Sequence, residues 1–422
     1  MTVQRTVVGP GTAQRPAPAP LWSWAREQFD LDPDYVHLAL SMLAPHPRPV
    51  REAIERHRRA LDRNPAQYFH SRDDQVRRVL DKAAAYLRTR PDSLALTEST
   101  TAGLAVVHTG MRLAPGDEIL STEHEHYAAS ELIRFKAAAS GATHRTIRLY
   151  EHGSAADAEE ITDALARGLR DSTRVLALTW VHSGTGVKLP LARIGEVVAR
   201  ANAGRPPEQR ILVCVDAVHG LGVEDFQVER LGCDFFAAGC HKWLFGPRGT
   251  GLVWGSDQGW AAVDPIVTSF DVEVFWPWYL GRVPDAEAPC ARLCTPGGFP
   301  AYEHRWALAE AFDFQEALGK ARVAARIAEL TAYCHARLTD LAGIRVRTPA
   351  DPSMRSGMVC FDVAGADPAD IVAALERKRI MAGQTPYRSS AIRFAPGVLN
   401  TADDIDRAVG ALDRIVRETG RR

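Results

Sequence analysis

One lysine of this sequence stands in a setting that could support covalent chemistry. Lys242 is flanked by His241 and Trp243, and a glycine-rich turn follows at residues 246–251. A lysine that forms an imine with a carbonyl compound must be held in place and partly desolvated, so that it can lose its proton. A surface lysine in a hairpin would give the same tripeptide, so this stretch alone leaves both interpretations open.

An acidic residue closes a very apolar run shortly before this lysine. Asp216 follows Val213-Cys214-Val215, and a carboxylate is costly to bury there unless a cation pairs with it. A protonated pyridine nitrogen would be such a cation, and pyridoxal phosphate (PLP) needs that pairing to act as an electron sink. One helix and one strand fit between Asp216 and Lys242, so these two residues could reach the same edge of the sheet. An aspartate that caps the next helix is the alternative.

Hydroxyl side chains lie between the predicted strand at 94–97 and the helix that follows it. Ser99, Thr100 and Thr101 precede a predicted helix at 104–111. Hydroxyls and backbone N–H groups at a helix N-terminus bind phosphate well. An ordinary N-cap would look the same, so this stretch too is indicative only in combination with the others.

Strand and helix patterns alternate around these residues. Short apolar runs predict buried strands at 94–97, 118–121, 174–181, 211–218, 234–238 and 251–254. Helical stretches lie between them, such as 194–202, whose apolar residues share one face. This alternation predicts an α/β fold with a mostly parallel sheet between helices, and an active site at the carboxyl ends of its strands.

The pattern changes after about residue 300. A helical region at 302–341 leads into strands near 344–347 and 358–363, and then into helices at 368–378 and 402–418. Thr401 is the expected N-cap of the last helix, with Asp403 and Asp404 in its first turn. We predict a disordered leader at 1–20, an N-terminal segment at 21–60 that packs on the small domain, a large cofactor-binding domain at 61–300 and a small C-terminal α+β domain at 301–422.

Composition argues against several classes of protein. The 51 basic and 52 acidic residues nearly balance, which does not call for nucleic acid or an anionic membrane as a partner. No apolar run approaches the roughly 20 residues that span a bilayer, and the leader lacks the apolar core of a signal peptide. Seven scattered cysteines indicate free thiols and no metal site. We therefore expect a cytoplasmic protein.

Taken together, these stretches resemble the class V aminotransferases, a family of fold-type I PLP enzymes that includes the cysteine desulfurases. The resemblance covers roughly residues 35–420. Three stretches are most similar to the isopenicillin N epimerase-like branch: 64–69, 123–127 and 241–244. The resemblance implies PLP as the cofactor, an amino-acid substrate, and a large domain whose sheet is of the seven-stranded type.

The resemblance also implies a role for individual residues. Lys242 would carry PLP as a Schiff base, Asp216 would pair with the pyridine nitrogen, and His124 would stack on the ring face opposite Lys242; these three form the catalytic set. Thr100, Thr101 and His241 would hold the phosphate, with His219 and Ser183 near the phenolic oxygen. The implied cofactor-binding set is thus Thr100, Thr101, His124, Ser183, Asp216, His219, His241 and Lys242.

Two further implications concern the substrate and the assembly. Arg393 resembles the arginine that clamps the substrate α-carboxylate, a task that suits a bidentate guanidinium; a surface arginine is the alternative. Residues 295–299 resemble a segment that reaches the neighbouring subunit's site, although a simple turn fits equally well. We expect a homodimer with its sites at the subunit interface.

Departures from the family bear on the reaction. The loop at 382–390, where desulfurases carry a nucleophilic cysteine, has none, which argues against a persulfide route. Trp180 and Gly239 replace the histidine and serine that are often found there. Epimerisation, transamination and β-elimination share one early step, so an epimerase, an aminotransferase or a lyase fits, including a C–S lyase on a cysteine S-conjugate.

Two interpretations come from other classes of protein. The glycines at 246–251 could belong to a nucleotide-binding oxidoreductase, but they lead into a predicted strand, whereas a dinucleotide loop should open a helix. The chain could also be a non-catalytic relative. Its lysine, aspartate and arginine argue against that, and no metal ligand set is apparent around His124-Glu125-His126.

Overall fold

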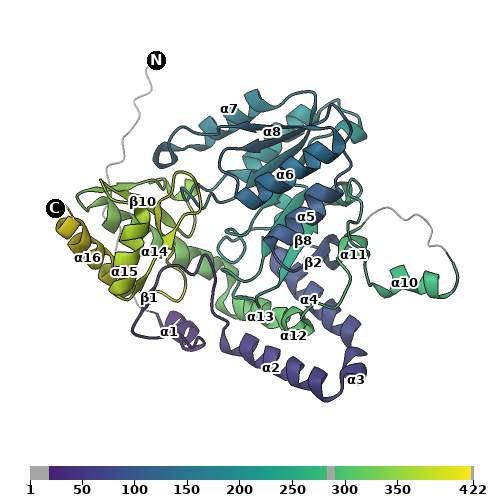
Figure 1. Cartoon of the computed structure of the whole chain (residues 1–422), viewed down its shortest axis with the longest axis horizontal. Helices are drawn as coiled ribbons and strands as arrows, with labels where there is room; N and C mark the ends of the chain where they lie inside the picture. The colour runs from purple at the N-terminus through teal and green to yellow at the C-terminus, as the bar shows by residue number, and fades with distance from the viewer. Residues whose placement is uncertain (1–18, 283–289, 420–422) are drawn as a thin grey trace.

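The chain folds around a seven-stranded, mainly parallel β-sheet (Figure 1). The computed structural model describes residues 19–282 and 290–419. The strands are β2 (Leu94–Thr97), β3 (Glu118–Thr122), β4 (Thr143–Ile147), β5 (Thr173–Thr179), β6 (Leu212–Asp216), β7 (Phe235–Gly239) and β8 (Gly251–Gly255). Their order is β2-β8-β7-β6-β5-β3-β4, and the antiparallel pairs are the two that β8 makes.

Alternate side chains of these strands enter two different cores. In β5, Val175 and Ala177 face one core, while Leu176 and Leu178 face the other. Both faces are covered, so the strands are apolar throughout instead of alternating with polar residues. The first core includes helices α5 (Thr100–Gly110) and α6 (Tyr127–Ser140), and the second includes α7 (Ala158–Gly168) and α8 (Leu191–Asn202).

The predicted fold class is confirmed, and all six predicted strands are present. The sequence patterns missed β4, which lies at the end of the sheet beside β3 alone. Its residues Thr143–Ile147 are mostly polar and partly exposed. An edge strand with one uncovered side does not need the continuous apolar run by which the inner strands were recognised.

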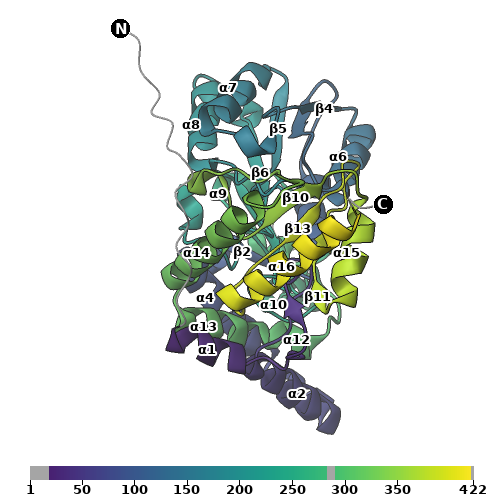
Figure 2. The ribbon, with the colours of Figure 1, turned by 90° about the vertical axis from the view of Figure 1, so that its left-hand side faces the viewer.

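A smaller antiparallel sheet lies beside the large one (Figure 2). Its strand order is β12 (Gly383–Gln384), β13 (Ile392–Phe394), β10 (Val359–Val363) and β9 (Ile344–Val346). Helices α14 (Lys320–Thr339), α15 (Pro368–Arg377) and α16 (Ala402–Thr419) pack against it around a separate core. The predicted cap of α16 is confirmed, because Thr401 Oγ1 accepts from Asp404 N at 3.2 Å.

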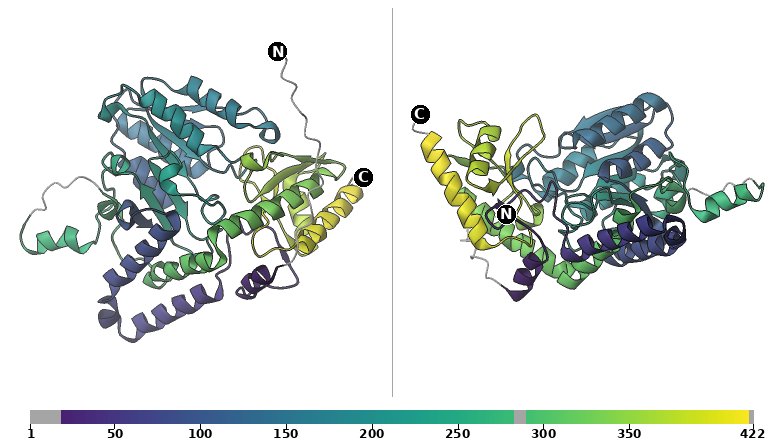
Figure 3. Two further views of the ribbon diagram at one scale, coloured as in Figure 1. Left: turned by 180° about the vertical axis from the view of Figure 1, so that it is seen from behind. Right: turned by 60° about the horizontal axis from the view of Figure 1, so that its bottom comes forward.

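The N-terminal segment touches both parts of the molecule. Strand β1 (Val36–His37) pairs in parallel with β11 (Ile380–Met381) of the small domain, and Arg26 forms an ion pair of 2.9 Å with Asp404. Helix α2 (Arg48–Arg63), in contrast, packs on helices that run beneath the large sheet (Figure 3). The domain boundaries stay a prediction, and residues 1–18 of the expected leader lie outside the described residues.

The helical region predicted at 302–341 consists of three helices. They are separated at Ala307 and at Gly319, whose φ of +84° favours glycine. Within the described ranges, no helix is both long and apolar enough to cross a membrane. The remaining helices are α1 (Pro20–Glu27), α3 (Pro65–Phe69), α4 (Arg72–Leu87), α9 (Asp257–Trp260), α10 (Val272–Tyr279), α11 (Ala291–Cys294), α12 (Tyr302–Trp306) and α13 (Leu308–Leu318).

Candidate active site

The two residues that first indicated chemistry lie at the same edge of the sheet. Asp216 is the last residue of β6, and Lys242 follows β7, the parallel neighbour of β6. The carboxyl ends of parallel strands meet at one edge, as the spacing predicted. The glycine loop after Lys242 leads into β8, a strand, so it lacks the strand-to-helix context of a dinucleotide loop.

Lys242 has the surroundings of a reactive amine. Burial lowers the pKa of its ammonium to about 8; the negative charge of Asp216 opposes this shift, and Arg393 adds to it. A substantial fraction of the amine is therefore neutral near physiological pH. A neutral amine has the lone pair needed to attack a carbonyl carbon or to accept a proton.

His219 lies directly beside this amine, with its Nε2 3.3 Å from Lys242 Nζ. The other ring nitrogen, Nδ1, accepts from Trp243 Nε1 at 3.3 Å. Burial lowers the pKa of His219 well below its usual value, so the ring is neutral. Because Nδ1 is an acceptor, the hydrogen is on Nε2 and points into the site as a donor.

Asp216 is a buried carboxylate that one backbone N–H and the nearby charge of Lys242 compensate in part. Its Oδ1 accepts from Val218 N at 3.1 Å, and burial raises its pKa. Within the part of the chain that the structure describes, it forms no ion pair. A cationic group that contacts this carboxylate would stabilise its charge.

Thr100 and His241 both lie close to Gly239. Thr100 Oγ1 accepts from Gly239 N at 2.8 Å, and a Cβ at position 239 would lie 2.9–3.0 Å from the His241 ring and Thr100 Oγ1. Glycine is needed there so that both side chains can come close to the strand end. Burial lowers the pKa of His241 to about 4, so the ring is a neutral donor. Thr101, the next residue of α5, is exposed.

His124 belongs to a stack of three rings. Its ring is 4.3 Å from Tyr150 and 4.8 Å from His182, nearly parallel to both. Tyr150 and His182 are 5.7 Å apart and hydrogen-bonded, so they lie on the same side of His124. Among the described residues, no further aromatic ring stacks on the other face of His124. Burial lowers its pKa to about 4, and its Nε2 has no partner among the described residues.

Arg393 comes from the small domain and reaches the large one. Its Nη1 donates to the Ser183 carbonyl at 3.1 Å, while its buried Nε has no hydrogen-bond partner among the described residues. Burial lowers the pKa of the guanidinium. It has no carboxylate partner within the described ranges. The guanidinium is therefore a buried cation that can still donate hydrogen bonds to an anionic ligand. The surface alternative for this arginine is wrong, since only 5% of the residue is exposed.

The structure adds a buried acid whose role the sequence patterns did not indicate. Glu125 accepts from Thr122 Oγ1 at 2.7 Å and from Thr179 Oγ1 at 2.6 Å. Thr179 is the register partner of Asp216 between β5 and β6. Burial raises the pKa of Glu125 to about 7, so it is largely neutral under mildly acidic conditions. A neutral Glu125 avoids a second negative charge beside Asp216.

The chemistry of these side chains fits PLP. Asp216 offers a carboxylate without an ion pair for a pyridinium, and His124 offers a ring face on which no other ring of the described residues stacks. Two threonines at the start of α5, together with His241, offer donors to a phosphate. Lys242 offers a partly neutral amine. No cluster of three potential metal ligands occurs in the described ranges.

The chain is similar over most of its length to known proteins. The family model of the class V aminotransferases matches residues 44–407. The chain is 30% identical to isopenicillin N epimerase of Streptomyces clavuligerus, over 94% of this chain and 99% of the relative. It is 23% identical to a probable cysteine desulfurase of Methanothermobacter thermautotrophicus, over 83% and 84%. A solved structure of C-DES, with glycine covalently linked to its PLP cofactor, superposes with a TM-score of 0.82 at 22% identity, over 92% and 98%.

Proposed function

Because the chain belongs to the class V aminotransferase family, whose cofactor is pyridoxal phosphate, we propose that it inverts the configuration at the α-carbon of an amino-acid substrate. One observation carries this proposal: Lys242 combines a lowered amine pKa with a buried acid, Asp216, and a buried cation, Arg393. PLP, when bound, withdraws electrons from the bonds at the α-carbon. The protein has to attach it, orient the substrate and move protons.

Four residues would prepare the cofactor for this chemistry. Lys242 would hold it as a Schiff base and then act as the base that takes the α-proton. Asp216 would keep the pyridine nitrogen protonated, and His219 Nε2–H would donate to the phenolic oxygen. His124 would cover the ring face opposite Lys242, backed by Tyr150.

Other residues would hold the two anionic ends. Thr100, Thr101 and His241 would bind the phosphate at the start of α5, where the helix dipole favours negative charge. Arg393 would bind the substrate carboxylate beside Ser183. The α-carbon would then lie between this clamp and Lys242, and excluded water would prevent side reactions.

The thiols support epimerisation over a persulfide route. Cys360 is the register partner of Arg393 in the small sheet, and Cys240 precedes Lys242 in the same turn; both are buried. Burial raises the pKa of Cys360 to about 11 and that of Cys240 to about 12. Each thiol therefore keeps its proton and is a poor nucleophile. Cys290, which is partly exposed, lines a cavity that residues of β2 also line.

Product analysis would test the proposed function. The holoenzyme is incubated in D₂O with isopenicillin N, the compound after which one relative is named, with the twenty common amino acids and with a cysteine S-conjugate. We expect α-deuterium in the substrate together with the opposite epimer by chiral chromatography. Release of a 2-oxo acid and ammonia from a cysteine S-conjugate would indicate a C–S lyase instead. A transaminated cofactor or a persulfide would also contradict epimerisation.

Arg393→Ala should lower kcat/KM about 10- to 100-fold with little change in cofactor content. A charge-assisted pair with a carboxylate contributes about 1.5–3 kcal/mol, which corresponds to that range of rates. Arg393→Lys should recover only part of the loss, because an ammonium cannot make a two-pronged contact. Steady-state kinetics and cofactor absorbance measure both quantities.

Unchanged efficiency of Arg393→Ala would show that another basic residue binds the carboxylate. Arg388, which is exposed on the neighbouring loop, is the residue to replace next. Arg345→Ala is a suitable control, because Arg345 lies on the same small sheet, is 80% exposed in its side chain and pairs with Asp362.

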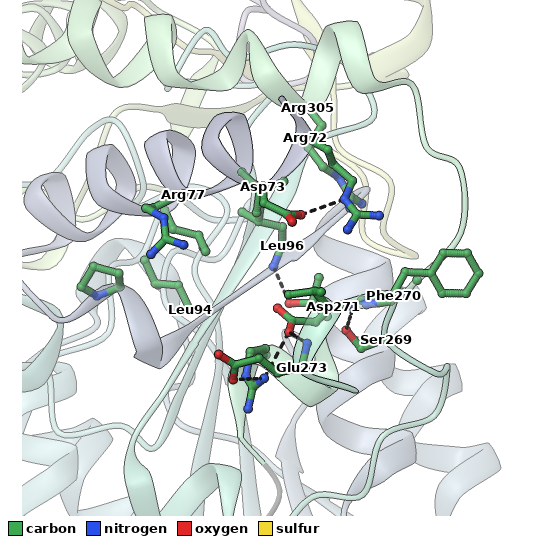
Figure 4. Close-up of a pocket in the computed structure, with 18 of the residues that line it drawn as sticks. Arg72, Asp73, Arg77, Leu94, Leu96, Ser269, Phe270, Asp271, Glu273 and Arg305 are labelled. Atoms are coloured by element: carbon green, nitrogen blue, oxygen red, sulfur yellow. Dashed lines mark hydrogen bonds and ion pairs between the residues drawn. The ribbon is translucent and has the colours of Figure 1, made fainter. Parts of the chain in front are cut away.

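We also propose a homodimer with its sites at the subunit interface. Helix α10 projects from the body (Figures 1 and 3) and exposes Trp276, Trp278 and Tyr279. A cavity of about 820 Å³ lies at its base, lined by α4, β2 and residues 295–298 (Figure 4). Light scattering should give twice the mass of the chain, and an active monomer would contradict this.

The free thiols support a cytoplasmic location.

A further inference from the structure

The β12–β13 hairpin carries a second side chain toward the candidate site. Its strands hold Arg393 opposite Gly383, and Tyr387 lies in the connecting loop. The ends of this loop are fixed, because Thr385 N donates to the Ala391 carbonyl at 2.9 Å and Ala391 N donates to Thr385 Oγ1 at 2.8 Å. The position of Tyr387 is thus set by the same hairpin that positions Arg393.

Tyr387 and Arg393 converge on one residue of the large domain. The Tyr387 hydroxyl is 2.8 Å from Ser183 Oγ, while Arg393 Nη1 donates to the Ser183 carbonyl at 3.1 Å. The Tyr387 ring also lies on Gly184, where an added Cβ would approach Cδ2 to 2.9 Å. A substrate whose carboxylate binds Arg393 would therefore have the phenol as an immediate neighbour.

The state of the phenol suits a proton donor. Burial raises the pKa of Tyr387 to about 12; the Ser183 hydrogen bond and Arg393 oppose this, and Asp216 and Glu125 add to it. The hydroxyl therefore keeps its proton at neutral pH. The residue is partly exposed, so solvent can exchange a proton with it.

Other acids near Ser183 are less suitable. The Tyr150 hydroxyl is already shared by His182 Nδ1 at 2.7 Å and Thr185 Oγ1 at 2.9 Å, and its ring lies behind His124. Cys360 is fully buried, with its Sγ 3.6 Å from the Ser183 carbonyl. The Tyr387 hydroxyl, in contrast, has one hydrogen-bond partner among the described residues, the weakly basic Ser183 hydroxyl.

We propose that Tyr387 is the second acid–base catalyst of the enzyme, which protonates the α-carbon on the face that Lys242 does not reach. This inference rests on the proposed epimerase function. Lys242 arrives from the large domain and Tyr387 from the small one, so a substrate held by Arg393 is approached by both groups. Epimerisation requires that a proton is taken from one face and delivered to the other, and two groups on opposite faces can do this without movement of either one.

The proton balance closes without a further reagent. The Cα–H bond breaks, and the proton binds the Lys242 amine while the electron pair remains with the substrate. A new Cα–H bond then forms with the phenolic proton, and the O–H electrons stay on Tyr387. Water returns a proton to the phenolate and takes one from the ammonium. Nothing is oxidised or reduced.

Tyr387→Phe tests the proposal, because it removes the hydroxyl and keeps the ring on Gly184. The holoenzyme is incubated in D₂O with the same panel of isopenicillin N and amino acids. We expect formation of the opposite epimer to fall by about 100-fold or more, the size of a general acid–base contribution. Lys242 should still exchange the α-proton, so deuterium should enter with retained configuration. A merely structural role for Tyr387 would lower exchange and epimerisation together.

Tyr333→Phe is a matched control. Tyr333 is a buried tyrosine of the small domain whose hydroxyl donates to Asp406 at 2.8 Å, and its loss should leave both rates unchanged. If wild-type enzyme exchanges no α-proton, the proposed function and this inference both fail. If Tyr387→Phe epimerises at the wild-type rate, or loses exchange and epimerisation to the same extent, this inference alone is overturned.

Discussion

Lys242→Ala should reduce turnover to background and remove the visible absorption band of the lysine-bound cofactor. The amine is both the attachment point and the proposed base, and its lowered pKa makes it competent for both tasks. Alanine supplies neither function. PLP could still bind through the phosphate donors and Asp216. This variant should therefore retain cofactor while it loses the visible band.

Borohydride trapping gives an independent measurement. Reduction of the wild-type holoenzyme should attach the cofactor to the peptide that contains Lys242. Lys320 is the matched comparison, because burial lowers its pKa to about 7 as well, yet its Nζ donates to the backbone carbonyls of Tyr86 and Phe226. Label on Lys320, or normal turnover by Lys242→Ala, would overturn the assignment.

Asp216→Asn should leave the cofactor attached to Lys242 but slow the reaction by about 10²- to 10⁴-fold. Breaking a buried ion pair costs about 3–5 kcal/mol, and the pyridinium is needed most in the transition state, where charge develops. Asparagine has the same shape, so the loss would be electrostatic. The visible spectrum and single-turnover rates measure attachment and chemistry separately.

A second buried acid provides the control for Asp216. Asp234 precedes β7 at the opposite edge of the sheet, where it accepts from Val213 N at 2.9 Å and Ser256 Oγ at 3.1 Å. Burial raises its pKa too. Asp234→Asn should lower the free energy of unfolding without changing the reaction rate of the holoenzyme. Normal cofactor content and an unchanged rate in Asp216→Asn would exclude the proposed pairing.

Much of the fold follows from local patterns. The inner strands are apolar on both faces because helices cover both, and this was visible as continuous apolar runs. The edge strand β4 was not visible, since its residues need no such cover. The cap at Thr401 was also predictable, because capping depends on residues three positions apart.

The core of the candidate site was predictable for a related reason. Asp216 and Lys242 follow adjacent parallel strands, and such strands end at one edge, so their spacing placed them together. Thr100 shares that edge, because β2 ends there before α5 begins. The roles of these residues stay predictions, although the structure brings them together.

The sequence by itself determined the layered fold, the sheet edge and the lysine, because strand patterns and turn positions are local properties. The tertiary structure alone decided which distant side chains meet there. Arg393, which the resemblance had indicated, and Tyr387, which it had not, both reach Ser183 because the two domains pack together. Two threonines of different strands donate to the buried Glu125. Such contacts depend on side-chain direction and on the packing of segments far apart in the chain, which no local pattern encodes.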